Sequence, residues 1–182
     1  MRFTATDIAD VKLVKPEAFA DKRGDFSEIW REERFADAGI AGPWVQDNHS
    51  RSRRYVLRGI HYQIEQPQGK LVRASRGRIF DVAVDLRRAS PTFAHWTGRE
   101  LSAQNRRMLW IPPGFGHGFL TLSGVAHVDY KCTAYHAPAH QRTIIWNDPD
   151  VAVEWPLPDG EEPILSDADE KGVRLEQADL YA

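Results

Sequence analysis

The feature that most constrains this fold is a series of short apolar runs, each bounded by turn residues, across the middle of the chain. The clearest run, residues 78–86, alternates between two faces, which is the period of a β-strand. One face carries Phe80, Val82, Val84 and Leu86, and the other carries Ile79, Asp81, Ala83 and Asp85. We expect further strands at residues 55–57, 60–63, 70–74, 107–111, 117–122, 126–134 and 143–146. Short strands at this spacing, with no long helical period between them, indicate an antiparallel sandwich or barrel.

Helix signals occur only near the two ends of the chain. Residues 31–38 could form a short helix closed by Gly39. Ser166, followed three residues later by Asp169, resembles a helix N-cap and its acid, and it would open a short turn before Gly172. No repeat or linker divides the sequence, so we expect one domain over residues 1–182, with strands in an N-terminal extension and a short C-terminal helical segment.

Composition excludes several classes of protein. Of the 182 residues, 42% are apolar and 27% are charged, which is ordinary for a globular domain. The net charge of −2 argues against a broad nucleic-acid-binding surface. No run approaches about 18 apolar residues, and Asp7 comes too early for a secretory signal. The single cysteine, Cys132, excludes a disulfide framework and a multi-cysteine zinc site. We therefore expect a soluble, cytoplasmic protein with no membrane or nucleic-acid partner.

The densest polar cluster lies at residues 56–63 and continues at 69–72. His61 could act as a general base, because an unperturbed histidine changes charge near neutral pH. Arg58 and His61 can face one pocket only if a bulge at Gly59 breaks the strand alternation. The alternative is that His61 is a half-buried strand residue and Arg58 a solvated cation.

A second cluster, residues 111–119, surrounds His117 with glycines at positions 114, 116 and 118. Glycines would keep the backbone around the histidine free of side chains, as the mouth of a ligand-binding barrel requires. A plain proline-glycine hairpin would explain the glycines but not the histidine.

Metal binding is the rival interpretation of both clusters. Residues 112–117 look like the second metal-binding motif of cupin barrels, Pro-x-Gly-x-x-His. In the first motif, however, Gln63 stands where a second histidine would follow His61, and Glu65 lies in the loop. A stable transition-metal site needs three or four protein ligands, and only two good ones are present. We therefore expect the pocket to work without a metal.

Two further segments carry candidate site residues. In residues 129–135, Tyr130 can donate a proton if it reaches the cavity, whereas Cys132 has neither a flanking basic patch nor a helix N-terminus and is interpreted as a packing residue. Gln46 and Asn48 stand two apart, so on a strand they face the same side. No Walker or GxGxxG motif is present, so any nucleotide would be held by side chains such as Arg23.

Together these segments resemble the dTDP-4-dehydrorhamnose 3,5-epimerase family, which has a cupin-like jelly-roll fold. The likeness extends from about Ile8 to Asp169, in order and without large gaps. The matching segments are residues 21–24, 46–50, 56–63, 69–72, 80–85, 90–93, 111–119, 146–149 and 154–156. Each is weak alone, but their combination is highly specific.

The resemblance implies an isomerase that uses no cofactor and inverts C3 and C5 of dTDP-4-dehydro-6-deoxy-D-glucose, giving dTDP-4-dehydro-L-rhamnose. His61 matches the base that abstracts the protons, and Asp169 matches its carboxylate partner. Lys70 matches the cation that stabilises the enolate oxygen. Tyr130 matches the acid on the opposite face of the sugar. His117, oriented by Asp81, matches a second histidine near the sugar.

The resemblance also implies ligand contacts along the chain, at Phe19, Arg23, Glu28, Gln46, Asn48, Arg58, Tyr135 and Gln141. Arg23 and Arg58 are expected on the diphosphate and sugar, and Phe19 and Tyr135 are stacking faces for the thymine. Gln141 stands where family members have glutamate, and Ala168 where they have lysine. Family members are homodimers in which N-terminal residues complete the neighbour's site, so Phe19, Arg23 and Glu28 are expected to act in trans.

Three alternatives stay open at this point. A mono-epimerase, inverting C3 or C5 only, would use the same base and acid. A metal-dependent cupin enzyme would instead bind one metal ion per chain. A non-catalytic sensor of sugar nucleotides is disfavoured, because binding alone needs no acid–base pair across a cavity.

Overall fold

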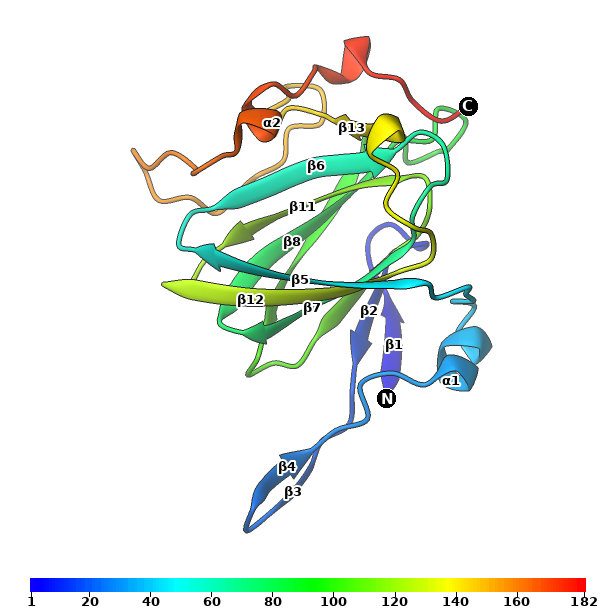
Figure 1. The fold of residues 1–182 in the computed structure, drawn as a ribbon, viewed down its shortest axis with the longest axis vertical. Coiled ribbons are helices and arrows are strands. Elements are labelled where there is room, and N and C mark those ends of the chain that lie inside the picture. Colours follow the sequence, from blue (N-terminus) through cyan, green and yellow to red (C-terminus); the bar gives the residue numbers. More distant parts are fainter.

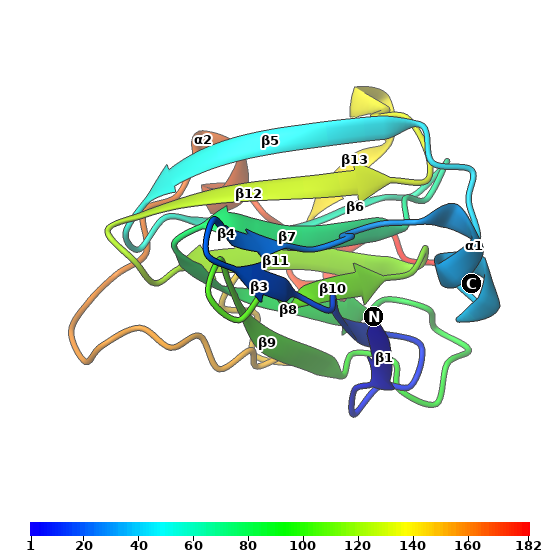
Figure 2. The same ribbon diagram turned by 90° about the horizontal axis from the view of Figure 1, so that it is seen from below.

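The computed structural model describes all residues, 1–182, and consists of two packed antiparallel sheets with short helices at their margins (Figure 1). The six-stranded sheet contains, in spatial order, β1 (Arg2–Ala5), β2 (Lys12–Lys15), β10 (Met108–Ile111), β7 (Lys70–Arg76), β12 (Val125–Cys132) and β5 (Gln46–Arg53). The five-stranded sheet contains β13 (Gln141–Thr143), β6 (Leu57–Gln63), β11 (Phe115–Thr121), β8 (Arg78–Asp85) and β9 (Trp96–Ser102). Figure 2 shows β5, β12 and β7 lying to one side of β8 and β9. The prediction of an all-β jelly roll is confirmed.

The main core lies between the two sheets, and the period-two pattern of β8 explains how it is filled. Ile79 and Ala83 of β8 pack in this core. Val82 and Val84 pack on the opposite face, where Leu175 and other residues of the C-terminal segment cover the sheet. Because β8 is buried on both faces, apolar residues occur on both sides of its predicted alternation, which is confirmed.

A third apolar cluster covers the outer face of the six-stranded sheet. It includes Phe35 of α1 (Glu32–Asp37), which is fully buried against Leu71 and Trp110. The helix ends at Asp37, and Gly39 closes it with a φ of +75° and an N–H that donates to Ala36 O at 2.8 Å. The helix predicted over residues 31–38 is therefore confirmed within one residue at each end.

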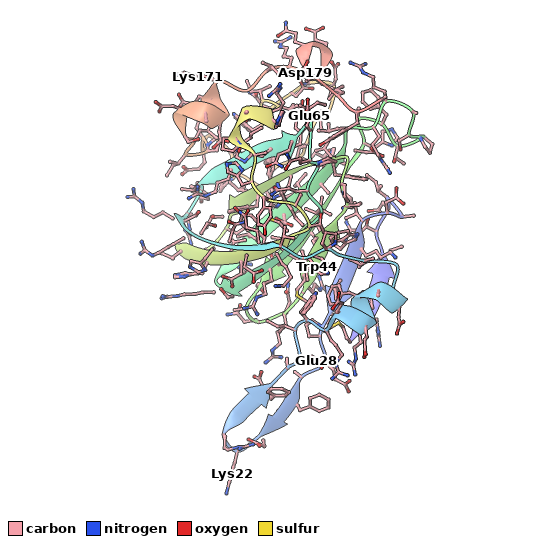
Figure 3. All side chains as sticks on the ribbon, turned by 45° about the vertical axis from the view of Figure 1, so that its right-hand side comes forward. Lys22, Glu28, Trp44, Glu65, Lys171 and Asp179 are labelled. Atoms are coloured by element: carbon pink, nitrogen blue, oxygen red, sulfur yellow. The ribbon has the colours of Figure 1, made fainter.

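An N-terminal hairpin of β3 (Phe19–Asp21) and β4 (Gly24–Phe26) projects from the body of the molecule (Figure 1). Two of its aromatic side chains are largely exposed, Phe19 at 59% and Phe26 at 70%. Lys22 lies at its tip, far from the rest of the chain (Figure 3). Exposed aromatic residues on a projecting element are typical of a contact surface.

The C-terminal region contains α2 (Asp167–Glu170) and two short 3-10 helices, η1 (Pro138–His140) and η2 (Leu175–Gln177). The Ser166 hydroxyl accepts from the Asp169 N–H, so the predicted N-cap is confirmed. No helix of this chain is long and apolar enough to cross a membrane.

The structure corrects three expectations. The strand predicted at residues 143–146 is instead β13, Gln141–Thr143, after which Ile144 only bridges Val173. Strands β5 and β9 lie outside the predicted ranges, and β1 and β2 give bounds to the strands expected in the N-terminal extension. Gly116 and Gly118 do not border the cavity around His117; Cβ atoms there would meet Ile60 and the Arg58 carbonyl, on the packed side of β11.

Candidate active site

Two adjoining cavities of about 200 Å³ each open between the sheets and share four lining residues, so they form one cleft. The shared residues are His61, Lys70, Tyr130 and Gln141. They belong to β6, β7, β12 and β13, so both sheets contribute to the walls. These four shared residues are separated by up to 80 positions in the sequence.

A bulge in β6 lets Arg58 and His61 face this cleft together. His61 is opposite His117 of β11, but Arg58 is opposite Phe119, so three steps along β6 match two along β11. Gly59 lies within the bulge with a φ of +123°, and a Cβ there would lie 2.5 Å from the β11 backbone. The bulge predicted at Gly59 is confirmed.

His61 is held by the carboxylate of Asp169, which α2 brings to the end of the cleft. His61 Nε2 lies 2.5 Å from Asp169 Oδ1. The carboxylate also accepts from the Gly59 N–H at 3.2 Å and from the Ser166 hydroxyl at 2.7 Å. Burial opposes ionisation of Asp169, but the hydrogen bonds from His61 and Ser166 outweigh it and lower the pKa of the carboxyl. Asp169 is thus an anion that orients His61 through Nε2 and leaves Nδ1 to accept a proton.

A second histidine–carboxylate pair lies deeper in the barrel. His117 Nε2 is 2.8 Å from Asp81 Oδ1, and the two side chains are only 8% and 0% exposed. Burial raises the pKa of Asp81 and lowers the pKa of His117, because each charged form loses its hydration. Asp81 Oδ2 is buried without a hydrogen-bond partner.

Lys70 and Tyr130 supply a cation and a hydroxyl to the same cleft. Lys70 is 9% exposed and forms no ion pair, and burial lowers the pKa of its ammonium group. Burial raises the pKa of the Tyr130 hydroxyl, so it stays protonated at neutral pH and can donate. His61 and Tyr130 belong to different sheets, so a potential base and a potential acid face the cleft from opposite walls.

Four of the predicted ligand contacts line the cleft. Gln46 and Asn48 of β5 share one face, as their spacing predicts, and are hydrogen-bonded to each other at 2.9 Å. Arg58 lines the same cavity as His117, and Gln141 lines both cavities. Tyr135 lies on the loop after β12 and is 64% exposed. The residue that follows it, His136, lines the cleft.

The three predicted N-terminal contacts lie elsewhere. Arg23 is 84% exposed on the hairpin and pairs with Asp21 at 2.6 Å. Phe19 and Arg23 line a separate cavity of about 260 Å³. Glu28 forms ion pairs with Arg31 and, at 3.3 Å, with Arg34. In Figure 3 the hairpin tip lies at the opposite end of the molecule from Lys171, which closely follows Asp169, so this chain's hairpin does not reach its own cleft.

The structure adds lining residues that sequence reasoning did not select: Ser50, Tyr62, Gln63, Gln68, Phe119 and His136. In the sequence Gln63 stands out only as a missing metal ligand, whereas in the structure it is 3% exposed and its carboxamide is hydrogen-bonded. Cys132 is fully buried, and burial raises the pKa of its thiol, which agrees with a packing role. No group of three or more His, Cys, Asp or Glu side chains is arranged to hold a metal ion.

Comparison with known proteins identifies relatives over nearly the whole length. The family profile of dTDP-4-dehydrorhamnose 3,5-epimerase matches residues 5–177. The chain is 53% identical over 182 residues to the dTDP-4-dehydrorhamnose 3,5-epimerase of Pseudomonas aeruginosa, covering 100% of this chain and 99% of that protein.

Solved structures give the same result. A dTDP-6-deoxy-D-glucose-3,5-epimerase from Legionella pneumophila, in complex with dTDP-4-keto-L-rhamnose, is similar with a TM-score of 0.94 and 45% identity, covering 98% of this chain and 94% of that one. A 3'-monoepimerase from Streptomyces bikiniensis, in complex with dTDP-quinovose, is similar with a TM-score of 0.88 and 36% identity, covering 94% and 87%. The chain therefore belongs to the dTDP-4-dehydrorhamnose 3,5-epimerase family.

Proposed function

We propose that this protein is a dTDP-4-dehydrorhamnose 3,5-epimerase, which converts dTDP-4-dehydro-6-deoxy-D-glucose to dTDP-4-dehydro-L-rhamnose. The observation that carries the proposal is the placement of His61 and Tyr130 on opposite walls of one cleft, with the Lys70 ammonium group between the sheets. Inversion at a carbon needs a base on one face and an acid on the other.

The reaction begins with proton abstraction next to the C4 ketone. His61 takes the proton at Nδ1, and the imidazolium that forms is stabilised by the Asp169 carboxylate 2.5 Å from Nε2. The electron pair of the broken C–H bond moves to the C4 oxygen, giving an enolate. Lys70, which has no carboxylate partner, stabilises this negative charge.

The reaction ends with a proton delivered to the other face of the same carbon. Tyr130 donates this proton as the enolate returns to the ketone, so no oxidant or reductant is required. Once the His61 imidazolium has lost its proton to solvent and the Tyr130 phenolate has regained one, repetition at the second carbon gives the double epimer. The buried pair of His117 and Asp81 borders the same cavity as Arg58 and supports the sugar end of the substrate.

The substrate's nucleotide is assigned to the open end of the cleft. Gln46, Asn48 and Gln141 offer polar contacts there, and Arg58 meets the negative charge near the sugar. Tyr135 offers an exposed ring for the thymine. The working unit that we propose is a cytoplasmic homodimer, in which Phe19, Arg23 and Glu28 of one chain complete the partner's cleft.

A mono-epimerase is the second candidate, because a 3'-monoepimerase is among the similar structures. Incubation with the 4-keto sugar nucleotide in D2O distinguishes the two. Deuterium at both C3 and C5 of the product is the result we expect, and deuterium at one carbon alone would overturn double epimerisation.

Two variants test the roles of the base and the acid in that experiment. His61→Ala should lose about a thousandfold in turnover while dTDP still binds, because the base contacts only the sugar. Tyr130→Phe should exchange deuterium without completing inversion, because only the returning proton is affected. Near-normal turnover of His61→Ala would show that His61 is not the base.

A further inference from the structure

Gln63, the last residue of β6, uses its whole carboxamide to hold neighbouring backbone. Its Nε2 donates to Gln66 O at 2.8 Å and to Tyr135 O at 3.2 Å. Its Oε1 accepts from the Ala137 N–H at 2.9 Å. Two donors and one acceptor are thus in use, and neither a glutamate nor a neutral histidine could supply all three.

Two more glutamines hold the same loop, residues 133–137. Gln68 Nε2 donates to Ala134 O at 2.8 Å. Gln46 Oε1 accepts from the His136 N–H at 2.8 Å. Consecutive backbone groups of the loop are therefore bonded to side chains of β5, β6 and the turn between β6 and β7.

The bonds fix the backbone of this loop but leave its functional side chains free. The Tyr135 side chain is 64% exposed and its hydroxyl makes no hydrogen bond. His136 lines the cleft, and its imidazole makes no hydrogen bond either. An aromatic side chain loses little conformational freedom on ligand binding when hydrogen bonds already fix its backbone.

We propose that Gln63 is a positioning residue for the nucleotide: it fixes the loop of residues 133–137 so that Tyr135 and His136 form a preorganised surface for the nucleoside diphosphate. The inference rests on the function proposed above. At the position where metal-dependent cupins carry a ligand histidine, this chain has a carboxamide that sets loop geometry. The loop carries none of the groups that move protons, so Gln63 acts on nucleotide affinity and not on the chemical step.

Gln63→Met tests this, because methionine keeps the length of the side chain and removes all three hydrogen bonds. We expect the Kd for dTDP, measured by isothermal titration calorimetry, to rise about tenfold. This is the size of effect that the net free energy of one hydrogen bond would produce. The KM for the sugar nucleotide should rise with it, and kcat should change by less than about threefold. Gln104→Met, the same substitution at an exposed site with no hydrogen bond, is the matched control and should leave the Kd unchanged.

A second variant and a double-mutant cycle keep the test decisive. Gln68 is only half-buried, so Gln68→Met should fold normally and should also raise the Kd. In a Tyr135→Ala background, Gln63→Met should add little, because both changes act through one loop.

Three outcomes would overturn the proposal: the same fold-change in both backgrounds, a lowered Tm with unchanged Kd, or a Tyr135→Ala protein that binds dTDP as tightly as the wild type. Deuterium exchange into the sugar, measured separately, reports whether the epimerase function itself holds.

Discussion

Three hydrogen bonds meet on the Asp169 carboxylate, from the His61 imidazole, the Gly59 N–H and the Ser166 hydroxyl. Ser166 has two tasks, because the same hydroxyl accepts from the Asp169 N–H as the N-cap of α2. One small side chain therefore both starts the helix and holds the carboxylate that orients His61. Its removal should affect acid–base behaviour as well as stability.

Ser166→Ala should lower kcat/KM about tenfold near neutral pH, because a hydrogen bond to a charged group is lost. The lost bond favoured the ionised carboxylate, so the pKa of Asp169 should rise and the acid limb of the pH–rate profile should move to higher pH. Ser166→Thr retains the hydroxyl and should restore the wild-type profile. A lowered Tm with an unmoved acid limb would mean that Ser166 serves only as an N-cap.

At the scale of single residues, the sequence was sufficient where a residue's position follows from the geometry of its own strand. The bulge was predictable because Gly59 interrupts a strand between Arg58 and His61. The pairing of His61 with Asp169 was expected only from the family resemblance, since 108 positions separate the two residues. No local pattern reveals a contact made by the packing of distant segments.

At the scale of elements, the close approach of β6 to β11 depends on the absence of a side chain at Gly59. Gly59→Ala would place a Cβ 2.5 Å from Gly118 Cα and 2.6 Å from His117 O, on a residue with a φ of +123°. We expect a loss of about 3 kcal/mol in the free energy of unfolding, measured in urea, because backbone cannot move aside cheaply. Gly124→Ala is the matched control, since a Cβ there meets nothing within 4 Å. Equal stability of the two variants would contradict this account of the bulge.

The end of β8 carries a buried carboxylate whose titration is coupled to folding. Burial opposes ionisation of Asp85, but hydrogen bonds from Arg87, Ser90 and Thr92 outweigh it and lower the pKa to about 2. Because the folded pKa lies below the ordinary value of 3.8, the stabilisation is complete above about pH 4 and is lost as the pH falls toward 2.

Asp85→Asn should therefore cost about 2 kcal/mol in the free energy of unfolding near neutral pH. The difference from the wild type should shrink as the pH is lowered to about 2.5. Urea unfolding at both pH values measures it. A difference that stays constant with pH would show that the hydrogen bonds, and not the charge, stabilise this turn.

The sequence predicted strands well where apolar residues set the period, and poorly where they do not. β8 was identified because both of its faces are buried. β5 was not among the expected strands, because its residues Gln46–Arg53 are all polar and only half of them are shielded. β9 interrupts its apolar residues with Gly98, Arg99 and Glu100, so the period-two signal is lost.

At the scale of the whole molecule, the hairpin of β3 and β4 gives the chain a reach that its own cleft does not use. Arg23 and Phe19 are exposed on this hairpin, whose tip residue Lys22 lies at the opposite end of the molecule from Lys171 (Figure 3). The sequence predicts strands in an N-terminal extension without bounds, and the structure pairs β3 with β4 there. The distance of this hairpin from the barrel depends on the three-dimensional path of the chain.

Complementation tests the proposed exchange of residues between subunits. Arg23→Ala and His61→Ala should each be strongly impaired as homodimers. When the two chains are co-expressed, about half of the dimers are mixed, and each mixed dimer has one intact cleft if Arg23 acts in trans. Activity should then recover to about a quarter of the wild type. No recovery would mean that Arg23 and His61 serve the same chain's cleft.

The position of α2 late in the chain bears on the stage of folding at which the cleft gains its complete His61–Asp169 pair. All eleven strands of the two main sheets precede residue 144, so the barrel walls and the His61 imidazole can be in place before α2 has docked. The imidazole receives its anionic partner only when residues 167–170 reach β6. During refolding, the signal of β-structure should therefore appear before turnover does. A chain whose α2 has not yet docked therefore holds a cleft in which the His61 imidazole lacks its anionic partner.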